Sequence, residues 1–124
     1  MEKPRILVVD DEEAIRNTLH EWFDGCGFDV DRAKDGQEAV EKCERKRYDV
    51  ITMDLNMPRM NGAEAMSRIK QRYPDVPIIL FTGTPMDWEE VPLNSAAKVL
   101  VKPLKLRTIE EEVRRFLPNG RKSK

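Results

Sequence analysis

The sequence is poor in the features that mark secreted, membrane-spanning and nucleic-acid-binding proteins. Its two cysteines, Cys26 and Cys43, fit no metal-binding spacing, so we expect both to be reduced core thiols in a cytoplasmic protein. No signal-like segment opens the chain, and the longest apolar runs fall far short of the ~20 residues that cross a bilayer. A formal net charge of −1 creates no field that would draw the protein to a membrane or to nucleic acid.

Apolar runs of strand length alternate with stretches of helical spacing along the chain. This alternation predicts an α/β fold with a doubly wound parallel sheet. A length of 124 residues suits one domain, with a core at about 5–117 and a basic tail at 118–124 that we expect to be disordered. The run 28–32 alternates apolar and charged residues, which favours an edge strand. The expected strands are 5–9, 28–32, 49–53, 78–81 and 98–101, and the expected helices are 13–24, 37–46, 63–72 and 106–117.

Charged residues stand at the C-terminal ends of three of these expected strands. Asp10 and Asp11 follow the first strand, Asp54 follows the third, and Lys102 follows the fifth. In a parallel sheet these ends share one edge, where open α/β folds bind their ligands. Three carboxylates brought together repel one another unless a cation lies between them, and a hard divalent ion with oxygen ligands would do that. The pattern therefore predicts a metal-and-phosphate site at this edge.

The segment between the fourth and fifth strands does not read as a regular helix. Thr84 and Pro85 can start a helix, but Pro92 removes a donor and disfavours helical geometry at the residue before it. We expect a shortened or irregular fourth helix of at most about seven residues, roughly 10 Å long.

Several short motifs, in order, resemble a response-regulator receiver domain. They are Val9-Asp10-Asp11, then Met53-Asp54-Leu55-Asn56-Met57-Pro58 with Asn61-Gly62, then Thr82, and finally Lys102-Pro103. Each is weak alone, but their order within an alternating α/β pattern is specific, and the likeness covers about residues 5–117. It implies a five-stranded sheet of flavodoxin-like order 2-1-3-4-5.

The resemblance also implies a chemistry centred on Asp54. This carboxylate would take a phosphoryl group from the phosphohistidine of a sensor histidine kinase, with Mg²⁺ or Mn²⁺ as the metal. Asp11, Asp54 and the backbone carbonyl of Asn56 would ligate the metal, and Asp10 would help directly or through a water. Mg²⁺ keeps several waters, which suits so few protein ligands.

The resemblance also implies roles for five positions around this centre. Lys102 would pair with the phosphoryl group, and Thr82 would donate its hydroxyl to a phosphoryl oxygen. Pro103 would form a cis peptide with the lysine before it, which aims the lysine inward. The Asn56 side chain and Thr84 would tune the lifetime of the phosphate.

Two departures from the family pattern concern signalling rather than phosphorylation. The family commonly has an aromatic residue on the fifth strand where this chain has Val99, and Pro92 interrupts the fourth helix. Both put the usual threonine–aromatic signalling route in doubt. We expect instead that the segment 84–94 is mobile and becomes ordered on phosphorylation.

The leading interpretation is a stand-alone receiver that relays phosphate to a histidine phosphotransferase or regulates a partner protein, without direct nucleic-acid binding. The alternatives are a piece of a longer regulator or hybrid kinase, and a pseudo-receiver that only binds partners. A flavodoxin-type carrier is disfavoured because the acidic run at 10–13 would repel a flavin phosphate, and a dinucleotide-binding role lacks its glycine-rich fingerprint. An aspartyl phosphatase would need a second acid where Asn56 stands. His20 lies off the apolar stripe of its helix, so we expect an exposed histidine that donates no phosphate.

Overall fold

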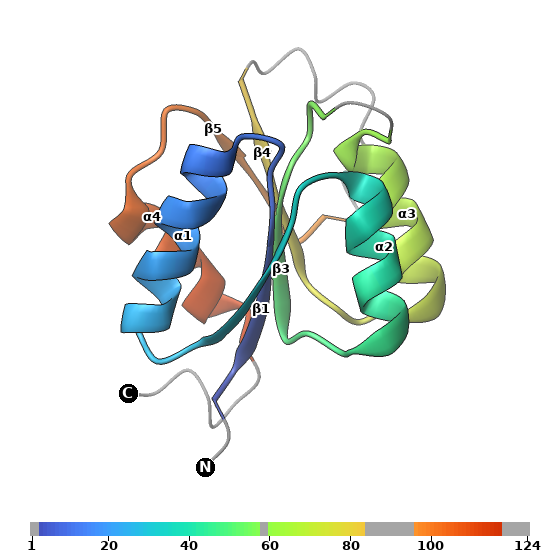
Figure 1. Ribbon diagram of the computed structural model, residues 1–124, viewed down its shortest axis with the longest axis horizontal. Coiled ribbons are helices and arrows are strands. Elements are labelled where there is room, and N and C mark those ends of the chain that lie inside the picture. The colour runs from blue at the N-terminus through green and yellow to red at the C-terminus, as the bar shows by residue number, and fades with distance from the viewer. Residues whose placement is uncertain (1–2, 58–59, 84–95, 118–124) are drawn as a thin grey trace.

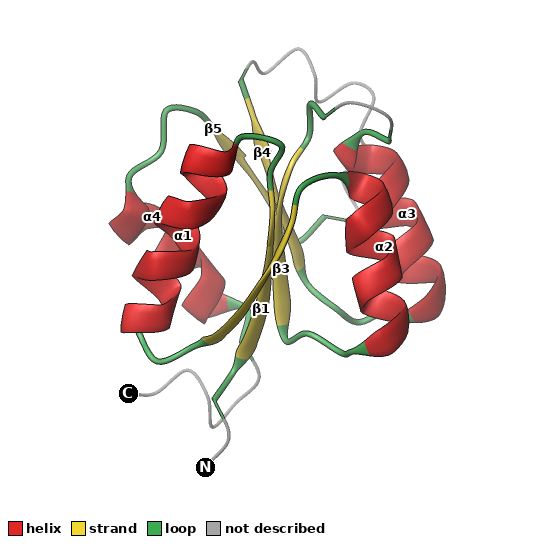
Figure 2. Ribbon diagram, viewed as in Figure 1, coloured by secondary structure: helices red, strands yellow, loops and turns green. Residues whose placement is uncertain are grey.

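The computed structural model describes residues 3–57, 60–83 and 96–117. A central parallel sheet of order β2-β1-β3-β4-β5 separates α1 and α4 on one face from α2 and α3 on the other (Figure 1). The strands are β1 Arg5–Val9, β2 Asp29–Ala33, β3 Val50–Asp54, β4 Ile78–Thr82 and β5 Lys98–Val101. The helices are α1 Glu13–Gly25, α2 Gly36–Arg45, α3 Gly62–Arg72 and α4 Leu106–Arg115. Helices therefore sandwich the sheet, as Figure 2 shows.

The sheet divides the apolar core into two clusters. Successive side chains of a strand point to opposite faces, so β1 sends Ile6 and Val8 toward α1 and α4, and Leu7 and Val9 toward α2 and α3. The inner strands β3 and β4 are buried along their whole length, whereas β2 is largely half-buried or exposed. The expected edge position of β2 and the doubly wound order are both confirmed.

Side chains at the helix starts fix where α2 and α3 begin. Asp35 accepts a hydrogen bond from the backbone N–H of Glu38 at 2.8 Å, and Asn61 accepts one from the N–H of Glu64 at 2.9 Å. These contacts satisfy N–H groups that the first turn of a helix leaves without partners. The residue before α1, Glu12, makes no such side-chain cap. The loop that leads into α1 must therefore be held in another way.

The expected boundaries lie within one or two residues of the observed ones. The last helix ends at Arg115, two residues before its expected end, although Leu117 still lies in the core. The expected irregular fourth helix and the C-terminal tail fall outside the described residues. Both cysteines are free thiols, as expected. Cys43 is buried in the core, which raises the pKa of its thiol to about 11 and keeps it protonated, whereas Cys26 is half-buried and packs against the core cluster beneath α1 and α4. No helix within the described ranges is long and apolar enough to span a membrane.

Candidate functional site

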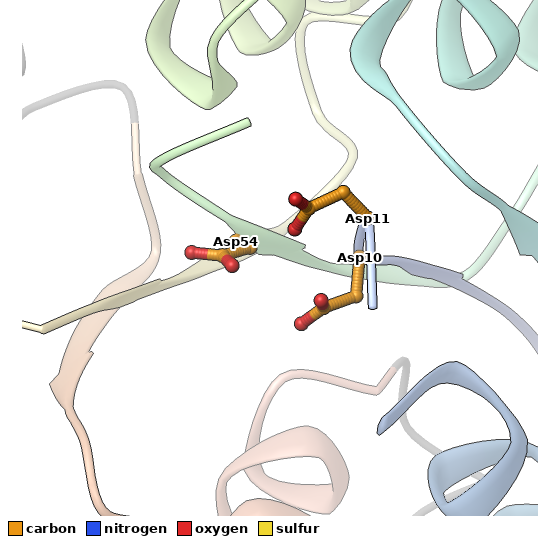
Figure 3. Close-up of side chains that lie close together, drawn as sticks. All are labelled: Asp10, Asp11 and Asp54. Atoms are coloured by element: carbon orange, nitrogen blue, oxygen red, sulfur yellow. The ribbon is translucent and has the colours of Figure 1, made fainter. Parts of the chain in front are cut away.

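Three carboxylates meet at the C-terminal edge of the sheet. Asp10 and Asp11 follow β1, and Asp54 ends the neighbouring strand β3, so the side chains lie next to one another (Figure 3). One oxygen from each carboxylate lies within 4.8 Å of the others. Asp10 and Asp54 are buried, while Asp11 is exposed. The convergence expected from the strand ends is thus present.

Asp10 is held by backbone contacts and leaves one oxygen unused. Its N–H donates to the carbonyl of Ala33 on β2 at 3.1 Å, and its Oδ1 accepts from the N–H of Glu12 at 2.9 Å. Its Oδ2 is buried and has no hydrogen-bond partner among the residues described. Burial is the main cause that raises the pKa of Asp10 to about 6. The hydrogen bond from the Glu12 N–H lowers the pKa of Asp10, and the negative charge of Asp54 raises it further. The Lys102 charge also lowers the pKa of Asp10, but burial outweighs it, so the net shift of this pKa is upward.

Asp54 occupies the centre of the site and is only 4% exposed. Its Oδ2 accepts a hydrogen bond from Lys102 Nζ at 3.1 Å, and its Oδ1 accepts from the N–H of Asn56 at 3.2 Å. Burial alone would lower the pKa of Lys102, but the hydrogen bond and charge of Asp54, with the charge of Asp10, raise it instead. The ammonium group is therefore fixed as a cation beside the carboxylate.

Backbone contacts between strand ends place Lys102 and Thr82. The N–H of Lys102 donates to the carbonyl of Thr82 at 2.8 Å, and the peptide between Lys102 and Pro103 is cis, as expected. Thr82 ends β4 and is fully buried. The side chain of Asn56 is exposed beside Asp54, whereas Thr84 lies outside the described residues.

Gly62 lets the start of α3 approach the end of β3. A Cβ at this position would lie 2.6 Å from the backbone oxygen of Asp54 and 2.9 Å from the Cα of Leu55. Both contacts are with backbone, which cannot move away as a flexible side chain would. The N–H of Gly62 also donates to the carbonyl of Leu55 at 2.8 Å. A glycine here therefore holds the loop after Asp54 against the strand end.

The donor set fits a hard divalent cation. Oxygen ligands of one Mg²⁺ lie about 2.1 Å from the ion and hence at most about 4.2 Å apart, so carboxylate oxygens within 4.8 Å need only small shifts. The unpaired Oδ2 of Asp10 supports this fit, because a buried carboxylate oxygen without a donor costs free energy. All three side chains offer the oxygen ligands that Mg²⁺ prefers.

A mainly apolar groove of about 460 Å³ runs from this site between α1 and α4. Asp10 and Lys102 provide the charged part of its lining. We call it the α1–α4 groove. Its apolar lining includes Ile15, Leu19, Phe81, Leu104, Leu106 and Ile109. The groove places an apolar surface directly beside the charged site.

The sequence did not reveal every feature near the site. Arg16 donates a hydrogen bond to the backbone carbonyl of Asp10, and no pattern of residue types signals a contact with a main-chain atom.

The expectation of an exposed His20 was wrong. Its ring is half-buried beside Val30 and Arg32 of the edge strand, because α1 leans over β2, and its Nδ1 has no hydrogen-bond partner in the described part of the chain.

A doubly wound sheet that gathers three carboxylates at its carboxyl edge, with a lysine on the central one, has the arrangement of a phosphoacceptor signalling module. The family model of the response regulator receiver domain matches residues 6–114. The chain belongs to this family, whose members act in two-component signalling with histidine kinases and downstream effectors.

Curated relatives and solved structures give the same result. The chain is 33% identical to the alkaline phosphatase synthesis transcriptional regulatory protein PhoP of Bacillus subtilis, over 91% of this chain and 48% of PhoP. It thus spans about half the length of the curated relatives it matches first. It resembles the chemotaxis protein CheY4 of Vibrio cholerae with a TM-score of 0.86 and 32% identity, over 94% of this chain and 100% of CheY4.

A further similar structure was solved with a metal. The response regulator TrrA of Thermotoga maritima, crystallised in complex with Mg²⁺-BeF, has a TM-score of 0.85 and 33% identity, over 92% of this chain and 99% of TrrA.

Proposed function

We propose that Asp54 is the phosphoacceptor, and that it takes a phosphoryl group from the phosphohistidine of a sensor histidine kinase in the cytoplasm. An oxygen of Asp54 would attack phosphorus, the bond between phosphorus and the histidine nitrogen would break, and the electron pair would stay on the histidine. The product is an acyl phosphate on Asp54. The observation that carries the proposal is that Asp54 lies within 4.8 Å of two other carboxylates and 3.1 Å from Lys102.

The other two carboxylates are less suited to be the nucleophile. Asp10 has one oxygen held by the Glu12 N–H, and among the described residues it makes no ion pair with a lysine at hydrogen-bond distance. Asp11 is exposed, and in the described part of the chain it makes no ion pair with a lysine that could neutralise a phosphoryl group. Asp54 alone of the three combines burial with a cation at hydrogen-bond distance.

The proposed roles of the neighbours follow from charge. Three carboxylates and one lysine carry a formal charge of −2, which would repel an incoming phosphoryl group. Asp10, Asp11, Asp54 and the carbonyl of Asn56 would hold Mg²⁺, or Mn²⁺, which supplies the compensating charge on the phosphoryl oxygens. Lys102 would move from the carboxylate to the phosphoryl group.

Thr82 would sense the phosphoryl group through a hydrogen bond. It ends the strand beside β3, and its backbone already bonds Lys102. We propose that its hydroxyl donates to a phosphoryl oxygen once Asp54 is phosphorylated. The exposed Asn56 side chain would lie at the entrance and affect how long the acyl phosphate survives attack by water; the same role for Thr84 stays a prediction.

We propose that the phosphodonor protein docks over the α1–α4 groove. The groove is apolar along its length and opens at Asp10 and Lys102, so a donor helix seated in it could bring a histidine to Asp54. The phosphate would then pass to a histidine phosphotransferase or change the contacts of a downstream protein. In this proposal the chain promotes only its own phosphorylation and dephosphorylation.

The test uses a small phosphodonor, so that it does not depend on knowing the kinase. Wild-type protein with acetyl phosphate and Mg²⁺ should gain one phosphate by intact mass, and Asp54→Asn should gain none. Asp49→Asn is the matched control. Asp49 is half-buried and immediately precedes β3, at the end of the strand far from Asp54, so this variant should be labelled like wild type. Labelling of Asp54→Asn at the wild-type rate would refute the assignment.

A further inference from the structure

Arg16 lies on the first turns of α1 and contacts the main chain of the acidic loop. Its Nη1 donates to the backbone carbonyl of Asp10 at 2.9 Å, and its own N–H donates to the carbonyl of Glu12 at 3.0 Å. The side chain is half-buried. The guanidinium thus reaches back over the loop and bonds a peptide group rather than a carboxylate.

The loop that receives this hydrogen bond has little else to hold it. Asp10, Asp11, Glu12 and Glu13 bring four negative charges into succession, and Glu12 provides no side-chain cap for α1. Within the described residues three other hydrogen bonds hold the loop: the Asp10 N–H donates to Ala33, the Glu12 N–H donates to the Asp10 side chain, and the main-chain N–H of Arg16 donates to the Glu12 carbonyl. Like charges along one short loop favour its opening, so a cation that bonds its backbone counters that tendency.

The carbonyl that Arg16 bonds is the one that sets the direction of Asp11. A peptide unit is planar, so the C=O of Asp10 and the N–H of Asp11 rotate together. Fixing the carbonyl therefore fixes the plane from which Asp11 extends its side chain toward Asp54. The same contact limits movement of Asp10, whose buried Oδ2 would face the metal.

We propose that Arg16 is a positioning residue for the metal site: its hydrogen bond to the Asp10 carbonyl holds Asp10 and Asp11 in the geometry that binds Mg²⁺ beside Asp54. The inference rests on the proposed function. Groups that orient metal ligands without touching the ion commonly account for 10- to 100-fold in metal affinity.

A neighbouring arginine offers a matched comparison. Arg32, on β2, donates to the side chain of Asn17 on α1 and lines the same surface as Arg16. It ties the helix to the edge strand and, among the described residues, makes no hydrogen bond or ion pair with the acidic loop. If an arginine in this region serves only to attach α1 to the sheet, loss of the Arg16 or the Arg32 side chain should change Mg²⁺ affinity equally.

The experiment measures Mg²⁺ binding by isothermal titration calorimetry and labelling by acetyl phosphate across a Mg²⁺ series. Arg16→Met removes the donors but keeps the apolar stem. We expect about 10-fold weaker Mg²⁺ binding, with labelling slowed at low Mg²⁺ and restored at saturating Mg²⁺. Arg16→Lys can still donate one hydrogen bond, so most of the affinity should return. Arg32→Ala should bind and label like wild type.

Three outcomes would overturn the inference. The first is wild-type Mg²⁺ affinity in Arg16→Met. The second is an equal loss of affinity in Arg32→Ala, which would indicate a general loosening of α1. The third is no recovery in Arg16→Lys when thermal melts show that it is folded. If wild-type protein binds Mg²⁺ but is never labelled, the proposed function fails, while the affinity comparison still decides the role of Arg16. Should Arg16→Met not fold, Arg16→Gln takes its place in the same comparison.

Discussion

The metal-free protein should become more stable when Asp10 is replaced by asparagine. The Asp10 carboxyl is fully buried, and burial is the largest cause of its raised pKa, followed by the opposing Glu12 N–H and the added repulsion from Asp54. At neutral pH the folded state without metal therefore holds an ionised group in a place that disfavours it. Asparagine keeps the shape and the acceptor for Glu12 but removes the charge.

The pKa sets the magnitude and the pH range of this effect. A rise from 3.8 to about 6 corresponds to roughly 3 kcal/mol of destabilisation when the group is ionised in both states. Because the folded state binds the proton more tightly, the penalty is absent below about pH 4, grows as pH rises, and is complete above about pH 6. Asp10→Asn should then gain about 2–3 kcal/mol at neutral pH, or roughly 10 °C in Tm.

The assay is urea unfolding with EDTA at neutral pH and again near pH 4, where the gain should vanish. Asp35→Asn is the control, because Asp35 is also buried but caps α2, and asparagine caps equally well. Added Mg²⁺ should narrow or reverse the difference, since only the wild type would offer the full set of proposed ligands. No gain at neutral pH, or the same gain in Asp35→Asn, would refute the reasoning.

Two further predictions concern polar side chains outside the proposed site, the buried Thr52 and the half-buried Tyr48. Thr52 is fully buried and its hydroxyl has no partner in the ranges that the structure describes, so Thr52→Val should raise the unfolding free energy by about 1 kcal/mol; a loss of stability in thermal melts would contradict this. Tyr48 donates to Asp31 at 2.7 Å, and Lys46 lies 3.0 Å from the same oxygen. Burial alone would raise the pKa of Asp31, but these hydrogen bonds lower it below 3.8, so they stabilise the fold above about pH 4 and less as pH falls. Tyr48→Phe should therefore lower the free energy of unfolding, measured with urea, by about 1–2 kcal/mol at neutral pH and by less near pH 3. An equal loss at the two pH values would contradict this prediction.

The fold and the meeting of the acidic residues could be predicted because both follow from short-range patterns. Apolar runs mark buried strands, and parallel strands bring their carboxyl ends to one edge, so Asp10, Asp54 and Lys102 had to converge. Helix ends were accurate only to one or two residues, because the last turn of a helix has weak hydrogen bonding.

Contacts that depend on the path of the main chain could not be predicted. The hydrogen bond from Arg16 to the Asp10 carbonyl and the burial of His20 against β2 both depend on how α1 tilts over the sheet. Residue types at helical spacing give the face of a helix but not its tilt. The α1–α4 groove was missed for the same reason, since its walls come from segments far apart in the sequence.

The site draws its groups from the first, third and fifth strands of the sheet, and this has a consequence for biosynthesis. Asp10 and Asp11 leave the ribosome long before Lys102, so a nascent chain that has formed β1 and β3 gathers carboxylates without the lysine that pairs with Asp54. Until β5 joins the sheet, the acidic edge is incomplete and cannot stabilise a phosphoryl group in the proposed way. In the proposed function, a chain in which β5 has not yet joined the sheet would therefore be a poor phosphoacceptor.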